Sequence, residues 1–161
     1  MSALESPSVQ RVRLVLEQAG IRSEIIELPG AARTAQAAAM FLGCEVAQIA
    51  NSLVFRAQAS DSAVLVMSSG ARKVDLARLA MIVGEPIGKA DADFVRERTG
   101  FAIGGVAPVG HAAPLRRFVE RSLSVHRELW AAAGHPHTVF RLSYEELLRI
   151  TAGTAIDAAL G

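Results

Sequence analysis

The part of this 161-residue chain best suited to chemistry is a glycine-rich run that extends from Thr99 to Pro108. Within it, Gly104 and Gly105 are adjacent, and glycines permit backbone conformations and close approaches that a side chain would forbid. Main-chain N–H groups that converge in such a turn can hold a carboxylate, a phosphate, or the oxyanion that forms when water attacks an ester. The run therefore predicts the floor of a functional pocket, with a tight turn beside the core as the alternative. It is not a Walker phosphate loop, because no Gly-Lys-Ser or Gly-Lys-Thr follows it.

A second candidate lies at the start of an apolar strand, where Asn51 and Ser52 precede Leu53-Val54-Phe55. Sheets often present functional groups at the ends of their strands, so both polar side chains are candidates for orienting a ligand. The alternative is a turn residue at the strand start, followed by a hydroxyl that bonds locally. Because no Gly-x-Ser-x-Gly sequence surrounds Ser52, a serine nucleophile is disfavoured.

Two further segments carry ionisable side chains. Lys73 lies just before a predicted helix start and is a candidate contact for a phosphate or a carboxylate, whereas Asp75 is better explained as the cap of that helix. His135 stands two residues before His137, and an imidazole is suited to acid–base work. Two histidines at this spacing without cysteine or acidic partners are a weak metal signal, so no metal site is predicted.

The composition predicts one soluble domain over residues 1–161. The chain has a mass of 17.0 kDa. Its apolar fraction of 51% is spread over short runs, none near the ~20 residues that a membrane span needs. The N-terminus lacks the features of a secretory signal and Cys44 is the only cysteine, so a cytoplasmic location is expected. A formal net charge of +1 disfavours a large nucleic-acid footprint. Local RNA contact stays open, because arginine suits phosphate and only Lys73 and Lys89 are lysines.

Caps, turns and periodicity predict alternating helices and strands without regular βαβ repeats, which favours a mixed sheet in an α/β (mixed α+β) fold. The predicted helices cover Ser8 to Ala19, Ala35 to Leu42 after a Thr34 cap, Asp75 to Val83, Asp91 to Arg98, and Ser143 to Ile150 with capping-box spacing between Ser143 and Glu146. The predicted strands cover Ser23 to Leu28, a hairpin of Ser52 to Ala57 with Ala63 to Ser68, Gly105 to Val109, Leu115 to Val119, and His137 to Leu142.

Taken in order, several of these segments resemble the YbaK/ProX family of aminoacyl-tRNA deacylases, which are related to the insertion domain of bacterial prolyl-tRNA synthetases. The resemblance rests on these segments: Thr34-Ala35, Leu42-Gly43, Gln48-Ile49, Asn51-Ser52-Leu53-Val54-Phe55, Lys73-Val74-Asp75-Leu76, Thr99-Gly100-Phe101, Gly104-Gly105-Val106-Ala107-Pro108 and Ala133-Gly134-His135-Pro136. It implies a compact, partly barrel-like mixed sheet surrounded by helices. It also implies a pocket for the aminoacyl-adenosine end of a mischarged tRNA.

The implied activity is hydrolysis, in trans, of the ester that joins a small amino acid to the wrong tRNA. The implied partners are the aminoacylated tRNA end and an aminoacyl-tRNA synthetase, with the chain a monomer or homodimer and without metal or other cofactor. In this family the loop from Gly104 to Pro108 lies against the substrate. We therefore expect catalytic roles for Asn51, Gly104 and Gly105. We expect substrate-binding roles for Ser52, Lys73, Thr99, Phe101, Val106, Pro108 and His135.

The sequence departs from the family at one position. The family usually places a lysine directly before the Ser/Thr-Leu of the strand start, and here Asn51 stands there. Replacing an ammonium by a neutral amide removes a charged hydrogen bond of about 1.5–3 kcal/mol. The alternative function is therefore a non-catalytic binder of aminoacyl-tRNA, a nucleotide or an amino acid on the same fold. A third alternative is that the chain is a purely structural partner of a synthetase.

Overall fold

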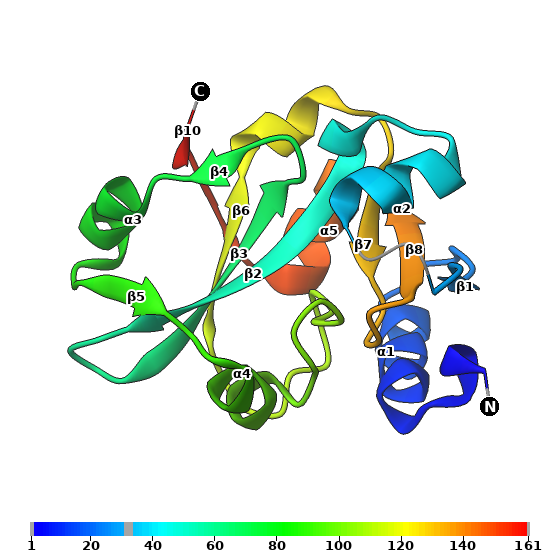
Figure 1. The fold of residues 1–161 in the computed structure, drawn as a ribbon, viewed down its shortest axis with the longest axis horizontal. Coiled ribbons are helices and arrows are strands. Elements are labelled where there is room, and N and C mark those ends of the chain that lie inside the picture. Colours follow the sequence, from blue (N-terminus) through cyan, green and yellow to red (C-terminus); the bar gives the residue numbers. More distant parts are fainter. Residues whose placement is uncertain (1, 31–33, 161) are drawn as a thin grey trace.

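The computed structural model describes residues 2–30 and 34–160, and its longest strands form an antiparallel hairpin that crosses the molecule (Figure 1). Strand β2 extends over Ile49–Ala57 and β3 over Ser62–Ser69. Their pairing is continuous, from Ala50 opposite Ser69 to Ala57 opposite Ser62. The hairpin predicted from two apolar runs is confirmed, and both strands are longer than predicted.

The other strands extend the hairpin on both sides into one mixed sheet. Across the sheet the order is β1 (Ile26–Glu27), β8 (Thr138–Leu142), β7 (Leu129–Ala132), β2, β3, β6 (Arg116–Glu120) and β9 (Thr154–Ile156), while β5 (Ile87–Lys89) also pairs with β2. The β2–β7, β3–β6 and β6–β9 pairs are parallel and the rest are antiparallel. A separate small ladder joins β4 (Lys73–Val74) to β10 (Ala159–Leu160). The predicted mixed sheet is confirmed.

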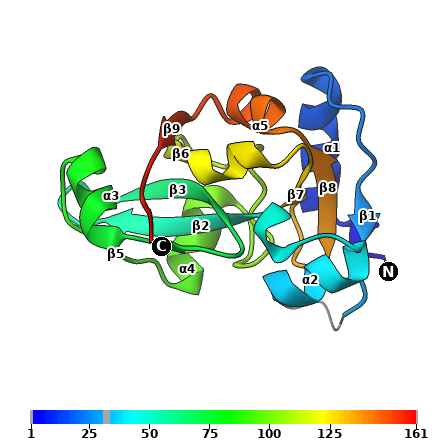
Figure 2. The ribbon, with the colours of Figure 1, turned by 90° about the horizontal axis from the view of Figure 1, so that it is seen from above.

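Helices cover both faces of the sheet, and Figure 2 shows α1 and α5 on the opposite side from α2. The α-helices are α1 (Pro7–Gln18), α2 (Ala35–Leu42), α3 (Leu76–Val83), α4 (Ala92–Thr99) and α5 (Tyr144–Thr151), and short 3-10 helices cover Ala3–Glu5, Val46–Gln48 and Arg121–Val125. The largest core cluster joins α1, α4 and α5 to one face of the sheet. On the other face, α2 and α3 each seal a smaller cluster. No helix within residues 2–30 and 34–160 is long and apolar enough to cross a membrane.

Local signals predicted most helix ends, but they misplaced the start of the first helix, predicted at Ser8, and one strand. Helix α1 begins at Pro7 with Ser6 as its cap, because Pro7 suits the first helical position and Ser6 Oγ accepts from Val9 N–H. The strand predicted over Gly105 to Val109 is wrong, because that segment is a loop. The capping box of Ser143 and Glu146 is confirmed, with bonds of 3.1 and 2.9 Å.

Candidate functional site

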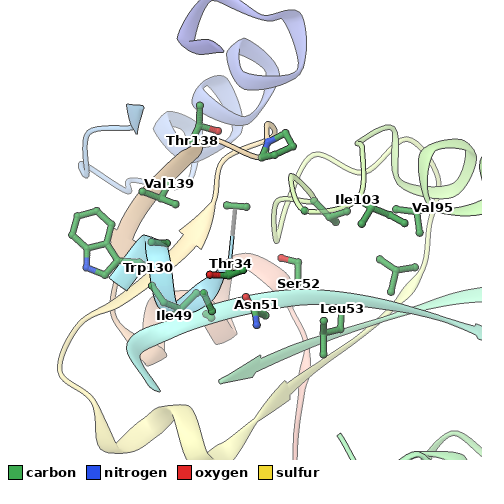
Figure 3. A pocket seen from close by; sticks show the side chains of 18 of the residues that line it. Thr34, Ile49, Asn51, Ser52, Leu53, Val95, Ile103, Trp130, Thr138 and Val139 are labelled. Atoms are coloured by element: carbon green, nitrogen blue, oxygen red, sulfur yellow. The ribbon is translucent and has the colours of Figure 1, made fainter. Parts of the chain in front are cut away.

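A cavity of about 420 Å³ lies where the sheet divides beside β2 (Figure 3). One edge of β2 has two successive neighbours. Strand β7 pairs with Ile49 and Ala50, and β5 pairs with Phe55 to Ala57. Neither pairs with residues 51–54, and this stretch lines the cavity. The cavity therefore occupies the gap between two strands that share one edge of a longer strand.

The wall of the cavity is mostly apolar, and none of the described residues that form it has an ionisable side chain. Its polar side chains are Thr34, Asn51, Ser52 and Thr138. A charged ligand group would therefore meet no counter-ion among these residues, and burying a charge without a partner is costly. The other lining residues are Leu28, Ala35, Ala38, Ile49, Ala50, Leu53, Val54, Phe55, Ala90, Val95, Ile103, Gly104, Val106, Trp130, Ala132, Pro136 and Val139.

The open stretch of β2 turns main-chain polar groups toward the cavity. On the β3 side, the carbonyl of Ile49 accepts from Gly70 N–H at 2.8 Å, and on the β5 side Gln58 N–H donates to Pro86 at 2.9 Å. Because the hydrogen-bonding direction alternates along an antiparallel ladder, the N–H and C=O of Ser52 point away from β3. Neither β7 nor β5 pairs with Ser52. A ligand in the gap meets a main-chain donor and acceptor there.

The side chains of Asn51 and Ser52 lie on opposite faces of β2, because side chains alternate along a strand. Figure 3 shows Ser52 on the side of the loop that carries Ile103. The Ser52 hydroxyl contacts Met67 Sδ at 3.4 Å and has no basic side chain beside it in the described wall. A serine nucleophile needs such a base, so the geometry favours a role in orientation.

Residues 102–108 form a loop, the glycine loop, on the side of the cavity opposite β2. Its residues Gly104 and Val106 line the cavity. Gly104 has a φ of +87°, which is strained for residues with a side chain, and Gly105 N–H donates to the carbonyl of Ala102 at 2.9 Å. A Cβ on Gly105 would lie 2.7 Å from both the carbonyl carbon of His135 and the nitrogen of Pro136. The two glycine-containing segments singled out in the sequence are thus packed backbone against backbone.

The structure brings only some of the predicted residues to the cavity. Asn51, Ser52, Gly104 and Val106 line it, while Gly105, Lys73, Thr99, Phe101, Pro108 and His135 lie outside the lining set. Lys73 is exposed on β4.

Among the predicted residues that do not line the cavity, several have structural contacts. The Thr99 hydroxyl donates to the carbonyl of Val95 at 2.6 Å and accepts from Phe101 N–H at 3.1 Å. His135 Nδ1 accepts from His137 N–H at 3.1 Å, and only its neighbour Pro136 reaches the cavity.

Several functional candidates were missed by sequence reasoning. Trp130 is the only tryptophan of the chain and lines the cavity, so its rarity was a usable signal. Ile103 lies in the glycine run and is half exposed at the wall. His111 is not part of any motif, yet it bonds to the glycine loop from outside the lining of the cavity.

His111 is a largely buried imidazole between the loop and β6. Its Nε2 lies 2.8 Å from the carbonyl oxygen of Ala107, and its Nδ1 lies 3.3 and 3.2 Å from Nε and Nη2 of Arg117. Since a guanidinium only donates, Nδ1 accepts and Nε2 carries the proton donated to Ala107. Burial, together with the charges of Arg117 and Arg11, lowers the pKa of His111 to about 4, although the Ala107 contact opposes the shift.

A model of the aminoacyl-tRNA editing domain matches residues 30–150 of this chain. The chain belongs to this family. The editing domain is also 43% identical to a solved structure described as a candidate trans-editing enzyme for prolyl tRNA synthetase. That similarity covers 97% of this chain and 99% of the other, with a TM-score of 0.90.

Other relatives agree with the assignment of the fold. A structure from work on epitope backbone grafting onto scaffold proteins is 40% identical, covering 97% and 99% of the two chains with a TM-score of 0.91. Hypothetical protein APE2540 is 23% identical over 93% and 99% of the chains and has a TM-score of 0.86, which shows a shared fold. The uncharacterized protein YwhH of Bacillus subtilis (strain 168) is 28% identical over 140 residues, covering 87% of this editing domain and 88% of YwhH.

The described residues of the editing domain contain no group of three or more His, Cys, Asp or Glu side chains placed to hold a metal ion.

The contact of Gly105 with His135 and Pro136 predicts the effect of one added methyl group. Gly105→Ala places a Cβ at 2.7 Å from that backbone, so one of the two segments must shift. We expect the free energy of unfolding in urea to fall by about 1–3 kcal/mol, the usual cost of overpacking. Gly30→Ala is the control, because a Cβ there meets no atom of residues 2–30 or 34–160 within 4 Å. Equal stability of the two variants would contradict the close approach.

The buried His111 predicts a pH-dependent part of the stability. Its folded pKa of about 4 lies below the ordinary 6.5, so the unfolded chain binds more protons between these values. The contribution is present above about pH 6.5 and is lost as the pH falls toward about 4, amounting to roughly 3 kcal/mol. Urea unfolding at about pH 7 and about pH 4.5 should show a smaller loss in His111→Gln than in the unmodified chain. His126→Gln should behave like the unmodified chain, and equal losses in all three proteins would contradict this origin.

Proposed function

We propose that this editing domain acts in trans as an aminoacyl-tRNA deacylase that hydrolyses the ester of a mischarged tRNA carrying a small, uncharged amino acid. The observation that carries the proposal is a cavity bounded by the open edge of β2 on one side and by Gly104 and Val106 on the other. Family membership and the similarity to the candidate trans-editing enzyme support the same reaction.

The cavity suits an attack by water rather than by a side chain. Water adds to the ester carbonyl carbon, the carbonyl oxygen becomes an oxyanion, and the ribose oxygen leaves with a proton as the amino acid is freed. Such a step depends on holding ester and water in place and on N–H donors aimed at the oxyanion. We assign the main-chain N–H of Ser52 to this role at the edge of β2, and those of Gly104 and Val106 in the opposite wall. Asn51 lines the cavity from the face of β2 opposite to Ser52, and its side-chain amide is assigned to orienting the ester.

The wall also sets the class of amino acid. Val54, Val95 and Val106 offer apolar contact to an alkyl side chain, whereas no described lining residue offers a charge. A lysyl, arginyl, aspartyl or glutamyl side chain would lose its hydration without gaining an ion pair. Small uncharged side chains therefore fit the cavity best.

The tRNA strand beyond the terminal adenosine must leave through the mouth of the cavity. Exposed Lys89 directly precedes Ala90, a residue of the wall, and we assign it to a phosphate of that strand. Lys73 lies outside the lining set, so its assigned contact with the tRNA terminus would lie further from the ester.

The activity is tested by deacylation of alanyl-, seryl-, threonyl- and cysteinyl-tRNA with the purified chain and no synthetase. We expect release of amino acid above the buffer rate for at least one substrate, and slower release by Gly105→Ala than by Gly30→Ala. A rate equal to buffer for all four substrates would refute deacylation by this protein.

A second candidate function is a non-catalytic binder of the aminoacylated tRNA end, and the observation that favours it is Asn51 at the position where relatives usually carry lysine. Under the deacylase proposal, Asn51→Ala lowers kcat/KM by about 2- to 12-fold, the factor given by a hydrogen bond of about 0.5–1.5 kcal/mol. Asn51→Lys tests the binder. Activity in this variant together with none in the unmodified chain would identify the native protein as a binding module. Quenching of Trp130 fluorescence by a non-hydrolysable aminoacyl-adenosine amide reports binding in either case.

A further inference from the structure

The glycine loop has few hydrogen bonds of its own. The segment is not part of any strand, and within residues 102–108 a main-chain hydrogen bond joins Gly105 N–H to the carbonyl of Ala102. The next fixed point is the carbonyl of Ala107, which accepts from His111 Nε2 at 2.8 Å. Both residues that line the cavity are therefore held locally. Gly104 lies within the turn, and Val106 lies between the turn and the bond to His111.

His111 is connected to the centre of the sheet through Arg117. Arg117 lies on β6, where it pairs with Leu65 of β3, and Leu65 is fully buried. Its guanidinium donates to His111 Nδ1 from Nε and Nη2. A neutral imidazole that accepts at Nδ1 must donate at Nε2, so Arg117 fixes the tautomer that Ala107 requires. The chain of contacts thus runs from a buried ladder to the wall of the cavity.

Arg11 of α1 holds the same region from the other side. Its Nε donates to the carbonyl of Gly110 at 3.0 Å and its Nη2 to that of Gly100 at 3.4 Å. Its guanidinium also lies 4.8 Å from the centre of the Phe101 ring, and that ring meets His111 edge to face at 6.1 Å. Gly100, near the start of the glycine run, and Gly110, two residues beyond its end, are therefore bonded to one side chain, and His111 lies between Phe101 and Arg117.

We propose that His111, oriented by Arg117, is a positioning residue that holds Gly104 and Val106 at the distance from β2 that the ester requires. This inference rests on the proposed deacylase function and concerns how its cavity keeps its shape. His111 lies outside the wall and touches no substrate, so its effect passes through the Ala107 carbonyl. Displacements on the order of 1 Å at a reacting centre cost about 100-fold in rate, so such a support acts on the catalytic step.

The kinetic experiment compares His111→Leu, His111→Gln and His126→Gln in single-turnover and steady-state deacylation, at a temperature where urea titration shows each variant folded. We expect His111→Leu to lower kcat by about 10- to 100-fold with a smaller change in KM. His111→Gln, whose amide keeps both a donor and an acceptor, should recover a measurable part of that loss. His126→Gln should match the unmodified chain.

Arg117→Leu provides a second route to the same contact. If Arg117 acts through His111, the double variant Arg117→Leu with His111→Leu should lose little more kcat than either single variant. Fully additive losses, or an unchanged kcat in His111→Leu, would overturn the proposal. Equal kcat in His111→Leu and His111→Gln would overturn it as well.

A separate measurement distinguishes failure of the proposed role of His111 from failure of the deacylase proposal. Hydrogen exchange of the amides of residues 104–107 and 109 is measured in the same variants without substrate. We expect faster exchange in this loop for His111→Leu and unchanged exchange for His126→Gln. If the unmodified chain deacylates nothing while the loop exchanges faster in His111→Leu, the deacylase proposal fails, and the role of His111 in holding the loop stands. Unchanged exchange in His111→Leu overturns the support.

Discussion

The pairing of β2 with β3 is the constraint on which the rest of the structure depends. Eight consecutive residues of each strand are paired, so β2 is held extended over a length that neither β7 nor β5 matches alone. Because each of these shorter strands covers only one end of the free edge, the middle of that edge stays open. The cavity is thus a result of unequal strand lengths, and it does not require a flexible lid or a second domain.

The same arrangement explains the chemical character of the site. Main-chain dipoles are fixed by the ladder and by the glycine loop, while the described side chains around them are neutral. Fixed dipoles in an apolar surrounding act on a developing charge more strongly than they would in water, and they do not need to reorganise during the reaction. Two ionisable groups, His111 and Arg117, adjoin the loop outside the lining of the cavity, and His111 bonds to its Ala107 carbonyl.

The sequence predicted the elements whose signals are local. Caps at Thr34, Asp75, Asp91 and Ser143 placed helix starts correctly, because each side chain bonds to main-chain N–H groups within three residues. The strands β4, β5, β7, β9 and β10 were missed, because the pairing of such short segments is decided by distant partners. The run Gly105 to Val109 looks like a strand by its apolar residues, but its course is decided by contacts with His111 and with the backbone at His135.

For the site, sequence reasoning selected Asn51, Ser52, Gly104 and Val106, which the fold brings to one cavity from segments some fifty residues apart. It could not show that the Thr99 hydroxyl is occupied by a bond within its own helix end, or that Lys73 lies on a separate ladder. Nor could it find Trp130 or His111, since neither forms a motif with its neighbours. Both become visible only through the sheet and the loop against which they pack.

The hydrogen bonds of Arg11 to Gly100 and Gly110 show that α1 belongs to the structural unit that forms the cavity. The family model matches residues 30–150, which leaves α1 outside the matched region. Yet α1 gives Val9, Val12 and Leu16 to the main core, and its Arg11 bonds to Gly100 within the glycine run and to Gly110 just beyond it. A fragment cut at the matched boundaries would expose one side of that core and release the loop. The smallest unit that keeps this cavity in shape is therefore larger than the region by which the family is recognised.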